Sequence, residues 1–457
     1  MTLKAINPVN GNLVAEYEEM SGEEAAAAVE AAHRAFLEWR KLSFADRARP
    51  MREAGRLLRE RAPQYARLMA EEMGKPISGG IGEAEKCAAG CDYFAENAET
   101  FLAHESIPIE GAKSFVAFQP MGVVLAVMPW NFPFWQVFRF IAPGLMAGNA
   151  GVLKHASNVP GCAKAIEDVL RDAGFPQDLF RTLMIGSKAV DSIIAHPHVR
   201  AVTLTGSEAA GRAVARKAGE MLKKTVLELG GSDPYLVLED ADVEKAAEIS
   251  TKGRLINSGQ SCIAAKRFIV VEPLRSRFEA LFAEKMRAAK MGDPLHEATQ
   301  VGPMARHDLR DDLHRQVEQS IAKGARALCG AVIPDGPGAY YPPTVLTDVR
   351  KGMPAYDEEM FGPVAAVIAA KDEAEAIAIA NDSEFGLGAG IITTDLARGE
   401  RLAIAAVEAG SVFVNGQVAS HVQLPFGGIK NSGYGRELSH YGIKEFVNIK
   451  TVVIAGG

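Results

Sequence analysis

Apolar residues recur at helical spacing through the first hundred residues of the chain, between many alanine and charged positions. Such a pattern is typical of amphipathic helices. The expected helices are residues 21–39, 46–74 and 78–102. Ser21 and Glu24 have the spacing of a capping box that would begin the first helix, and Pro63 and Pro76 interrupt the later ones. We therefore expect a helical layer over the first hundred residues.

The pattern then changes to short β-branched runs that alternate with helical segments. The expected strands are residues 123–128, 151–154, 181–185, 199–203 and 225–229, and the expected helices are 161–173, 188–195 and 208–221. Strands that alternate with helices pair in parallel, so this region predicts a doubly wound sheet.

A second alternating series covers residues 234–418. Its expected strands are residues 235–238, 268–271, 364–369, 389–392 and 411–415. No linker rich in Ser, Pro or Gly separates the two series, so we expect closely packed domains. The last strand-like segment, residues 448–454, has no neighbour in the sequence and must pair with a remote segment or another subunit.

Length and charge limit the classes of function. A chain of 457 residues is too long for a single ordinary core. Its net charge of −7, with mixed signs along the chain, leaves no basic face for nucleic acid or a membrane surface. No secretion leader is visible and no apolar run approaches the roughly 20 residues of a membrane span. We expect a cytoplasmic protein with neither nucleic-acid nor membrane partners.

The cysteines favour reduced thiols over a disulfide framework, because there are five of them spread along the chain. Cys87 and Cys91 lie one helical turn apart, but no second Cys/His pair accompanies them, so we expect core packing and no metal site. Cys262 lies in a Gly-containing polar stretch before the strand 268–271. It is a candidate nucleophile only if other chemistry converges on it, and otherwise a packing residue.

Two further segments suggest a binding site. Gly206, Ser207 and Gly211 lie where a strand ends and a helix begins, and the free N–H groups of such a junction can bind an anion. Lys154, at the end of another strand, could add a positive charge. Alternatively, the junction binds nothing and the lysine is only solvated.

Two other segments could carry catalytic groups. Asn131 lies between Pro129 and Pro133 among aromatic residues, and an amide held rigidly can donate a hydrogen bond to an oxyanion. A stiff aromatic loop is the simpler alternative. Glu228 ends a strand beside two glycines, and Glu359 lies in a second stiff turn. A buried carboxyl could serve as a base, whereas an exposed one would only be solvated.

Together these segments resemble the NAD(P)-dependent aldehyde dehydrogenase superfamily, and the resemblance covers residues 7–451. The segments follow one another in the order of that superfamily's motifs and at about the same spacing. The matching segments are Pro129-Trp130-Asn131-Phe132-Pro133, Gly206-Ser207 with Gly211, Glu228-Leu229-Gly230-Gly231, Gly259-Gln260-Ser261-Cys262 and Glu359-Met360-Phe361-Gly362-Pro363. Five matches in register are a specific signal.

The resemblance implies a role for each matching residue. Cys262 would attack an aldehyde, Asn131 would stabilise the oxyanion, and Glu228 would be the general base that activates the hydrolytic water. The implied cofactor contacts are Trp130, Lys154, Gly206, Ser207, Leu229, Glu359 and Phe361. Ser157 stands where NAD enzymes of this superfamily often carry a glutamate, which favours NADP as the preferred cofactor, with NAD also accepted. If Ser157 only caps a turn, NAD would be preferred.

Within the superfamily, the chain resembles the short bacterial succinate-semialdehyde dehydrogenases. Arg139 and Ser420 match that group's carboxylate pocket, which implies succinate semialdehyde as substrate. The alternative for Arg139 is an arginine that bridges subunits or domains. Residues 421–423 depart from the Asp-Pro-Arg expected in the group, so glutarate semialdehyde or a plain aliphatic aldehyde remains open.

The implied α/β fold has a Rossmann-like cofactor domain, an α/β catalytic domain and a small β-flap for oligomerisation into homodimers or homotetramers. The expected boundaries are residues 1–100 and 119–229 for the cofactor domain, 230–435 for the catalytic domain, and 101–118 with 436–457 for the flap.

Three rival functions are weaker. A coenzyme A-acylating enzyme would not need the base Glu228, and a non-enzymatic scaffold would not need the set of catalytic residues. A papain-like thiol hydrolase would need a histidine in a recognisable context.

Overall fold

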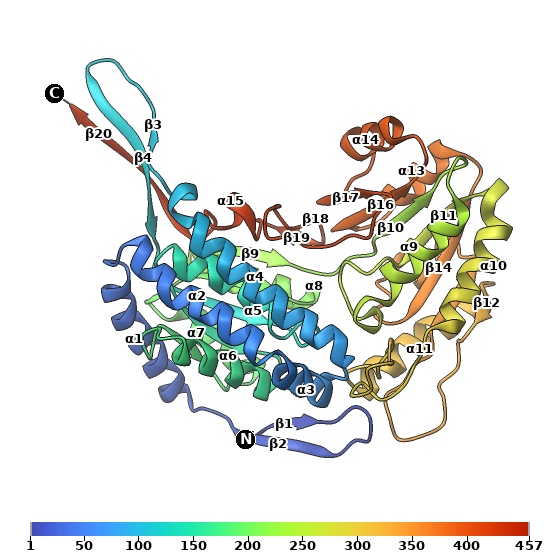
Figure 1. Ribbon diagram of the computed structural model, residues 1–457, viewed down its shortest axis with the longest axis horizontal. Coiled ribbons are helices and arrows are strands. Elements are labelled where there is room, and N and C mark those ends of the chain that lie inside the picture. The colour runs from blue at the N-terminus through green and yellow to red at the C-terminus, as the bar shows by residue number, and fades with distance from the viewer. Residues whose placement is uncertain (1, 456–457) are drawn as a thin grey trace.

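Two mainly parallel β-sheets organise the computed structural model, which describes residues 2–455 (Figure 1). In order, the first sheet contains β19 (Gly433–Tyr434), β9 (Lys224–Glu228), β8 (Val199–Thr205), β5 (Val123–Met128), β6 (Ala150–His155) and β7 (Phe180–Thr182). All its pairs are parallel except that of β9 with β19. The predicted doubly wound sheet is therefore confirmed.

Helices cover both faces of this sheet. They are α1 (Gly22–Trp39), α2 (Phe44–Glu60), α3 (Ala62–Met73), α4 (Ile77–Phe101), α5 (Trp135–Met146), α6 (Pro160–Asp172), α7 (Val190–Ala195), preceded by the short η1 (Ser187–Ala189), and α8 (Glu208–Glu220). The capping box of Ser21 and Glu24 is present. Pro76 is the N-cap of α4, and Pro63 lies in the first turn of α3. The first twenty residues are not helical, because β1 (Thr2–Ile6) and β2 (Leu13–Glu18) pair antiparallel there.

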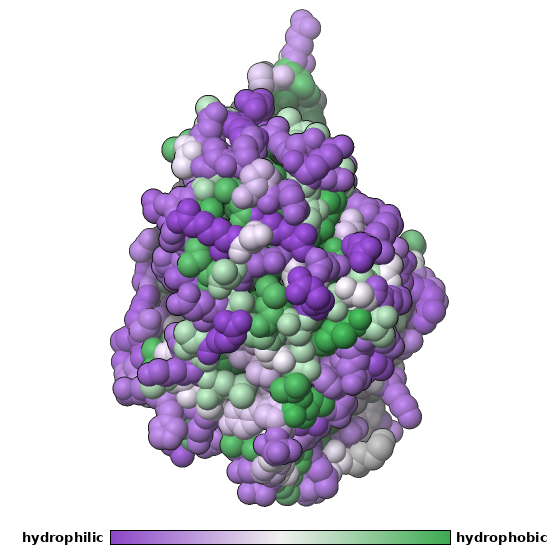
Figure 2. All heavy atoms as spheres, turned by 90° about the vertical axis from the view of Figure 1, so that its right-hand side faces the viewer, coloured by the Kyte–Doolittle hydropathy of each residue, from purple (hydrophilic) through white to green (hydrophobic). Residues whose placement is uncertain are grey.

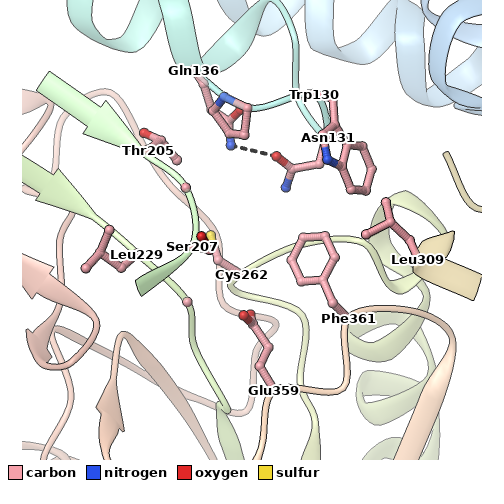
Figure 3. Close-up of a pocket in the computed structure, with 13 residues that line it drawn as sticks. Trp130, Asn131, Gln136, Thr205, Ser207, Leu229, Cys262, Leu309, Glu359 and Phe361 are labelled. Atoms are coloured by element: carbon pink, nitrogen blue, oxygen red, sulfur yellow. Dashed lines mark hydrogen bonds between the residues drawn. The ribbon is translucent and has the colours of Figure 1, made fainter. Parts of the chain in front are cut away.

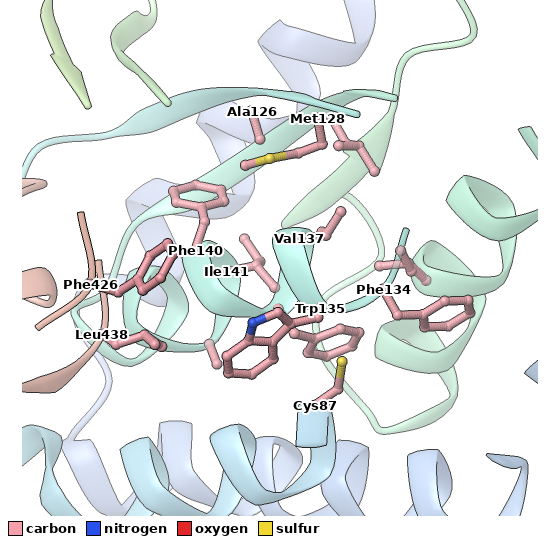
Figure 4. Close-up of a cluster of buried hydrophobic side chains, with 14 of the residues drawn as sticks. Cys87, Ala126, Met128, Phe134, Trp135, Val137, Phe140, Ile141, Phe426 and Leu438 are labelled. Carbon is pink, nitrogen blue, oxygen red and sulfur yellow. The ribbon is translucent and has the colours of Figure 1, made fainter. Parts of the chain in front are cut away.

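Helix α5 was not predicted, and it lies between the sheet and α4 (Figure 4). All twelve of its residues are buried, so it lacks the polar face that marks a helix in a sequence. The carboxylate of Glu83 on α4 accepts hydrogen bonds from the N–H groups of Phe134 and Trp135, at 2.8 and 2.9 Å. A residue distant in sequence thus satisfies the free donors of the first turn.

The second sheet is also mainly parallel, with only its β12–β13 pair antiparallel. Its strands, in order, are β12 (Arg326–Cys329), β13 (Thr344–Thr347), β14 (Val364–Ala370), β11 (Arg267–Val271), β10 (Pro234–Val237), β16 (Gly388–Ile392) and β17 (Ser411–Val414). Its helices are α9 (Val243–Leu255), α10 (Glu272–Ala288), α11 (His307–Ala322), α12 (Pro354–Asp357), α13 (Glu373–Asn381) and α14 (Leu396–Ala405). Strands β12 and β13 were not predicted.

An arm of antiparallel strands projects from the body in both views (Figures 1 and 2). In it, β4 (Ala112–Pro120) pairs with β20 (Val447–Ala455) along its whole length and with β3 (Glu105–Ser106). The segment without a sequence neighbour therefore pairs within its own chain. Ile449, Val453 and Ile454 are exposed on the arm. Residues 456 and 457, which the expected flap includes, lie outside the described residues.

Four short elements remain, which are η2 (Ile256–Gly259), β15 (Phe385–Gly386), β18 (Ile429–Lys430) and α15 (Ser439–Gly442). Of these, β15 and β18 pair antiparallel with each other. The chain passes from β9 to β10 through residues 229–233, and β19 returns from the C-terminal part to pair with β9. Among the described residues, no helix has the length and apolar character needed to cross a membrane.

Candidate active site

A cavity of about 270 Å³ lies where the two halves of the chain meet (Figure 3). Its lining is Pro129, Trp130, Asn131, Gln136, Thr205, Gly206, Ser207, Leu229, Gly230, Cys262, Leu309, Glu359 and Phe361. These residues come from the ends of β5, β8 and β9, the starts of α5 and α11, and the loops that follow η2 and α12. Most of the predicted site residues therefore share one cavity.

Cys262 follows a turn with an unusual backbone. Asn257, Ser258 and Gly259 have consecutive positive φ angles of 50°, 56° and 77°. A Cβ on Gly259 would lie 2.3 Å from the carbonyl carbon of Gly362, so no side chain fits there. This turn brings the cysteine from the end of α9 into the cavity.

A buried cation, Lys266, holds the loop that carries Cys262. The ammonium of Lys266 donates hydrogen bonds to the carbonyl oxygens of Ser261 and Cys262, at 2.8 and 2.6 Å. Burial raises the pKa of the Cys262 thiol to about 12, although the charges of Lys266 and Arg139 act in the opposite direction. The thiol is therefore protonated at neutral pH.

The amide of Asn131 is fixed on three sides and almost fully buried. Its Oδ1 accepts a hydrogen bond from Nε2 of Gln136 at 3.0 Å, and its Nδ2 donates to the carbonyl oxygen of Gln260 at 3.1 Å (Figure 3). Nδ2 of Asn257 donates to the backbone oxygen of Asn131 at 2.7 Å. These bonds point the NH₂ group toward the cysteine loop and leave its second N–H available. Sequence reasoning missed both Gln136 and Asn257.

The junction of β8 and α8, which the sequence suggests as an anion-binding site, is closely packed. Ser207 is the N-cap of α8, and its Oγ accepts a hydrogen bond from the N–H of Ala210 at 3.4 Å. A Cβ on Gly211 would lie 2.6 Å from a methyl carbon of Leu229. The absence of a side chain at this glycine lets β9 pack closely on α8, beside the free N–H groups of the helix start.

The side of the cavity formed by the loop after α12 carries an aromatic pair and a carboxylate. The rings of Trp130 and Phe361 meet edge to face, with centroids 5.8 Å apart. Oε1 of Glu359 accepts a hydrogen bond from the N–H of Gly231 at 3.0 Å and lies 3.2 Å from Nζ of Lys266. The carboxylate thus links the cysteine loop to the crossing segment between the sheets.

Lys154 and Ser157 lie outside the lining of this cavity. Lys154 is the buried penultimate residue of β6, and burial lowers its pKa. Within residues 2–455 it has no carboxylate within 4.0 Å and no hydrogen-bond acceptor. Ser157 is exposed on the loop that leads to α6. A cation without an acidic neighbour is thus available at this edge of the sheet.

Glu228 is buried at the end of β9 and does not line the cavity. Neither of its carboxyl oxygens has a hydrogen-bond partner in the described part of the chain. Burial raises the pKa of Glu228 well above its usual value, and the carboxylate of Glu437 raises it further. Both effects favour the protonated form of this carboxyl.

Arg139 has a different environment from the expected one. It is buried on α5, forms an ion pair with Glu437, and donates to Oγ1 of Thr205 at 3.1 Å. Its guanidinium carbon lies 4.7 Å from the centre of the Phe426 ring. The structure therefore gives Arg139 the bridging contact that was the alternative hypothesis, and it does not place the residue in the cavity lining.

Ser420 also lies outside the cavity lining but next to a second cation. Its Oγ accepts hydrogen bonds from Nζ of Lys86 at 2.7 Å and from Nε1 of Trp135 at 3.1 Å. Sequence reasoning missed Lys86 because nothing in its helical context marks it as different from a solvated lysine.

Comparison with known proteins identifies the family. Residues 1–452 match the model of the aldehyde dehydrogenase family. A Synechocystis sp. protein named probable succinate-semialdehyde dehydrogenase, NADP(+), is 50% identical over 455 residues, which cover 100% of both chains. A Mycobacterium tuberculosis protein named succinate-semialdehyde dehydrogenase, NADP(+), 1 is 49% identical over 460 residues, again with 100% of both chains covered.

Solved structures agree with this assignment. The succinic semialdehyde dehydrogenase from Streptococcus pyogenes, determined in complex with NADP+, superposes with a TM-score of 0.97 and is 36% identical in sequence. The superposition covers 99% of this chain and 100% of that one. The family match over nearly the whole sequence, and the agreement of sequence and fold, show that this chain belongs to the aldehyde dehydrogenase family.

Proposed function

We propose that the protein oxidises an aldehyde to a carboxylate, with Cys262 as the nucleophile. The observation that carries the proposal is that the Cys262 thiol and the Asn131 amide line the same cavity as the β8–α8 junction. A nucleophile, an oxyanion donor and a dinucleotide-type junction are thereby brought together from three remote parts of the sequence.

The first step requires transfer of the Cys262 thiol proton to a base, a task that we assign to Glu228 in its deprotonated form. Attack by the Cys262 thiolate on the carbonyl carbon forms a tetrahedral thiohemiacetal, whose oxygen carries the negative charge. The free N–H of the Asn131 amide and the backbone N–H of Cys262 are the donors for this oxyanion, because neither has another acceptor in the described residues. Asn131 needs no reorganisation, since Gln136 and Asn257 already fix it.

The site residues fit a nicotinamide dinucleotide. Ser207 and the first turn of α8 offer N–H groups for its phosphates, beside Gly206, whose own N–H donates to the backbone oxygen of Glu228 at 3.0 Å. Glu359 offers acceptors for ribose hydroxyls, and Lys154 offers a cation with no competing carboxylate. The chemistry that such a cofactor supplies when bound is acceptance of a hydride from the thiohemiacetal carbon, which becomes a thioester. With Ser157 in place of an acidic residue, Lys154 can attract a 2′-phosphate, so NADP is the preferred cofactor and NAD is also accepted.

Glu228 is the general base for hydrolysis of the thioester. Its buried carboxyl oxygens have no competing donor, and its raised pKa makes the deprotonated carboxylate a stronger base toward water than that of an exposed glutamate. This proposal favours water over coenzyme A as the acyl acceptor, because a thiolate would need no base.

We assign succinate semialdehyde as the substrate and succinate as the product. The relatives at about 50% identity carry that substrate in their names. Glutarate semialdehyde and plain aliphatic aldehydes are the alternatives. For the assembly, the arm with exposed Ile449, Val453 and Ile454 offers an apolar edge for a homodimer or homotetramer.

The direct test is the initial rate of NADPH formation by the purified protein with succinate semialdehyde and NADP. We expect rapid turnover by the wild type and none by Cys262→Ala. Glu228→Gln should give a burst of at most one NADPH per active site followed by slow turnover, because the thioester would accumulate. The absence of NADPH formation with any aldehyde would contradict the proposal.

A further inference from the structure

Lys266, immediately before β11, is a fully buried cation that takes no part in the proposed steps. An ammonium has three N–H groups, and a buried one needs oxygen atoms around it. It donates hydrogen bonds to the carbonyl oxygens of Ser261 and Cys262, at 2.8 and 2.6 Å. Oε1 of Glu359 lies 3.2 Å from its Nζ. These three oxygens belong to two separate segments of the candidate active site.

The ion pair with Lys266 engages only one oxygen of Glu359. Oε1 also accepts a hydrogen bond from the N–H of Gly231 at 3.0 Å, so the backbone and the cation hold it together. Oε2 has no donor among the described residues, and the side chain lines the cavity that holds Cys262. The carboxylate points toward Cys262 in Figure 3. Lys266 thus orients a carboxylate whose second oxygen is open to a ligand.

The ammonium of Lys266 is also the main charge that acts on the thiol. Burial raises the pKa of Cys262 to about 12, and of the charged groups nearby Lys266 has the largest effect, which lowers this pKa. Arg139 acts in the same direction, whereas Glu359 and Asp233 raise the pKa of the thiol. The two members of the Lys266–Glu359 ion pair therefore act on Cys262 with opposite sign.

The contacts of Lys266 favour its charged form, although burial opposes it. Burial lowers the pKa of Lys266, the carboxylates of Glu359 and Asp233 raise it, and the charge of Arg254 acts in the same direction as burial. Because its three N–H groups face three oxygens of the protein, Lys266 keeps none for a substrate atom. It can act only through the residues that it contacts.

We propose that Lys266 is a positioning residue whose single ammonium joins the loop that carries Cys262 to Glu359, and whose charge makes the thiol more reactive toward an electrophile. The inference rests on the proposed function and deepens it, because Cys262 is the proposed nucleophile and Glu359 the proposed ribose contact. A cation near the thiol favours the thiolate, which is the reactive form. The alternative is an anchor without an electrostatic role.

The two members of the ion pair allow a test by sign. The measurement is the rate of Cys262 alkylation by iodoacetamide at pH 8 without cofactor, from mass mapping of the peptide that contains residue 262. In Lys266→Met the thiol becomes less acidic, so we expect the rate to fall about 3- to 10-fold. In Glu359→Gln a repelling charge is lost and Lys266 is no longer paired, so we expect the rate to rise about 3-fold.

Exposed charges provide the controls, and Lys252→Met and Glu400→Gln should label at the wild-type rate. Loosening of the loop would change the access of iodoacetamide to Cys262 in the same direction in both ion-pair variants. Changes of equal sign, or no change in either variant, would overturn the electrostatic role. If Lys266→Met does not fold, Glu359→Gln still decides, because a rate that falls or stays constant would overturn the proposal.

Calorimetric titration with NADP, in the absence of substrate, tests the orientation of Glu359. Lys266→Met should bind NADP about 3- to 10-fold more weakly than the wild type, because Oε1 of Glu359 loses its cation. An unchanged affinity would overturn the positioning of Glu359 by Lys266. If Glu359→Gln also binds NADP as the wild type does, the assignment of Glu359 to the cofactor is wrong instead. A wild type that forms no NADPH with any aldehyde would contradict the proposed function, whereas the labelling rates do not depend on turnover.

Discussion

Arg139 and Glu437 form a buried ion pair next to Glu228. Both members of the pair are at most 5% exposed at their side chains. One guanidinium thus faces two carboxyl groups and contacts only Glu437 directly. Glu228 is the carboxyl left without a partner, so burial and the charge of Glu437 both favour its protonated form. Burial and, after it, the charges of the ion pair thereby determine the proton affinity of the proposed general base.

Removal of the charge of Glu437 should shift the pH profile of the enzyme. In Glu437→Gln, the pKa of Glu228 should fall, because a repelling carboxylate is lost and Arg139 becomes free to attract it. The deprotonated base then persists at lower pH, and we expect the acid limb of the kcat profile to move to lower pH. The measurement is kcat from pH 5 to 9, with the exposed Glu400→Gln as control. A limb that stays in place would exclude this coupling.

Loss of Arg139 should chiefly affect stability. Arg139→Met leaves the charge of Glu437 buried without a partner, which costs about 3–5 kcal/mol. The double substitution Arg139→Met with Glu437→Met removes both charges and should recover most of that loss. Urea unfolding of the three proteins measures it. Equal losses in the single and double variants would show that packing, rather than the ion pair, is responsible.

The sequence predicts the parallel strands of both sheets because their β-branched runs are short and clearly bounded. It fails at α5, whose residues are apolar on every side and whose first turn is capped by the remote Glu83. Strand β12 also escapes prediction, because it is short, lies at the sheet edge and is partly exposed. Strand β13 is buried but has only four residues, two of them threonines.

In the site too, residues that lie in local motifs were predicted, whereas contacts that only the tertiary fold creates were not. Cys262, Asn131 and the glycine-rich junctions stand out in local motifs, and the structure brings them into one cavity. The partner of Arg139 could not be predicted, since an arginine next to a carboxylate pocket and one bonded to Glu437 have the same local sequence. Lys86 was missed for the same reason: only the tertiary fold places it against Ser420.

The high pKa of Cys262 predicts slow alkylation of the protein without cofactor. Since the thiolate is the reactive form and the pKa is about 12, its labelling by iodoacetamide should increase about tenfold per pH unit between pH 7 and 9. Mass mapping of the peptide that contains residue 262 isolates this cysteine from the others, and Cys262→Ala is the blank. A plateau below pH 9 would show that the resting thiol is more acidic than its burial indicates.

A second buried carboxyl predicts a pH-dependent stability. Burial raises the pKa of Glu72 from 4.5 to about 7, although its carboxylate accepts hydrogen bonds from the N–H groups of Gly161 and Cys162. The unfolded chain releases this proton at lower pH than the folded protein, so stability is lost as the pH rises from about 4.5 to about 7. The loss approaches about 3 kcal/mol.

Glu72→Gln removes this titration and should flatten the dependence of the free energy of unfolding on pH across that window. An exposed glutamate offers a matched control, because Glu400→Gln leaves the buried carboxyl and its surroundings in place and should retain the wild-type slope. Denaturant titrations at pH 5 and pH 8 suffice for the comparison. A variant with the same slope as the wild type would assign the pH dependence to other groups.

Cofactor preference should depend on the charge at position 157. Ser157 is exposed on the loop after β6, and Lys154 lacks an acidic partner among the described residues. Ser157→Glu introduces a carboxylate that repels a 2′-phosphate and can accept hydrogen bonds from both ribose hydroxyls. We expect kcat/KM for NADP to fall about 100-fold relative to that for NAD, which corresponds to about 3 kcal/mol. Ser157→Ala tests the hydroxyl alone and should retain the preference for NADP. If the glutamate variant keeps the wild-type ratio, the phosphate must bind elsewhere and Lys154 is not its partner.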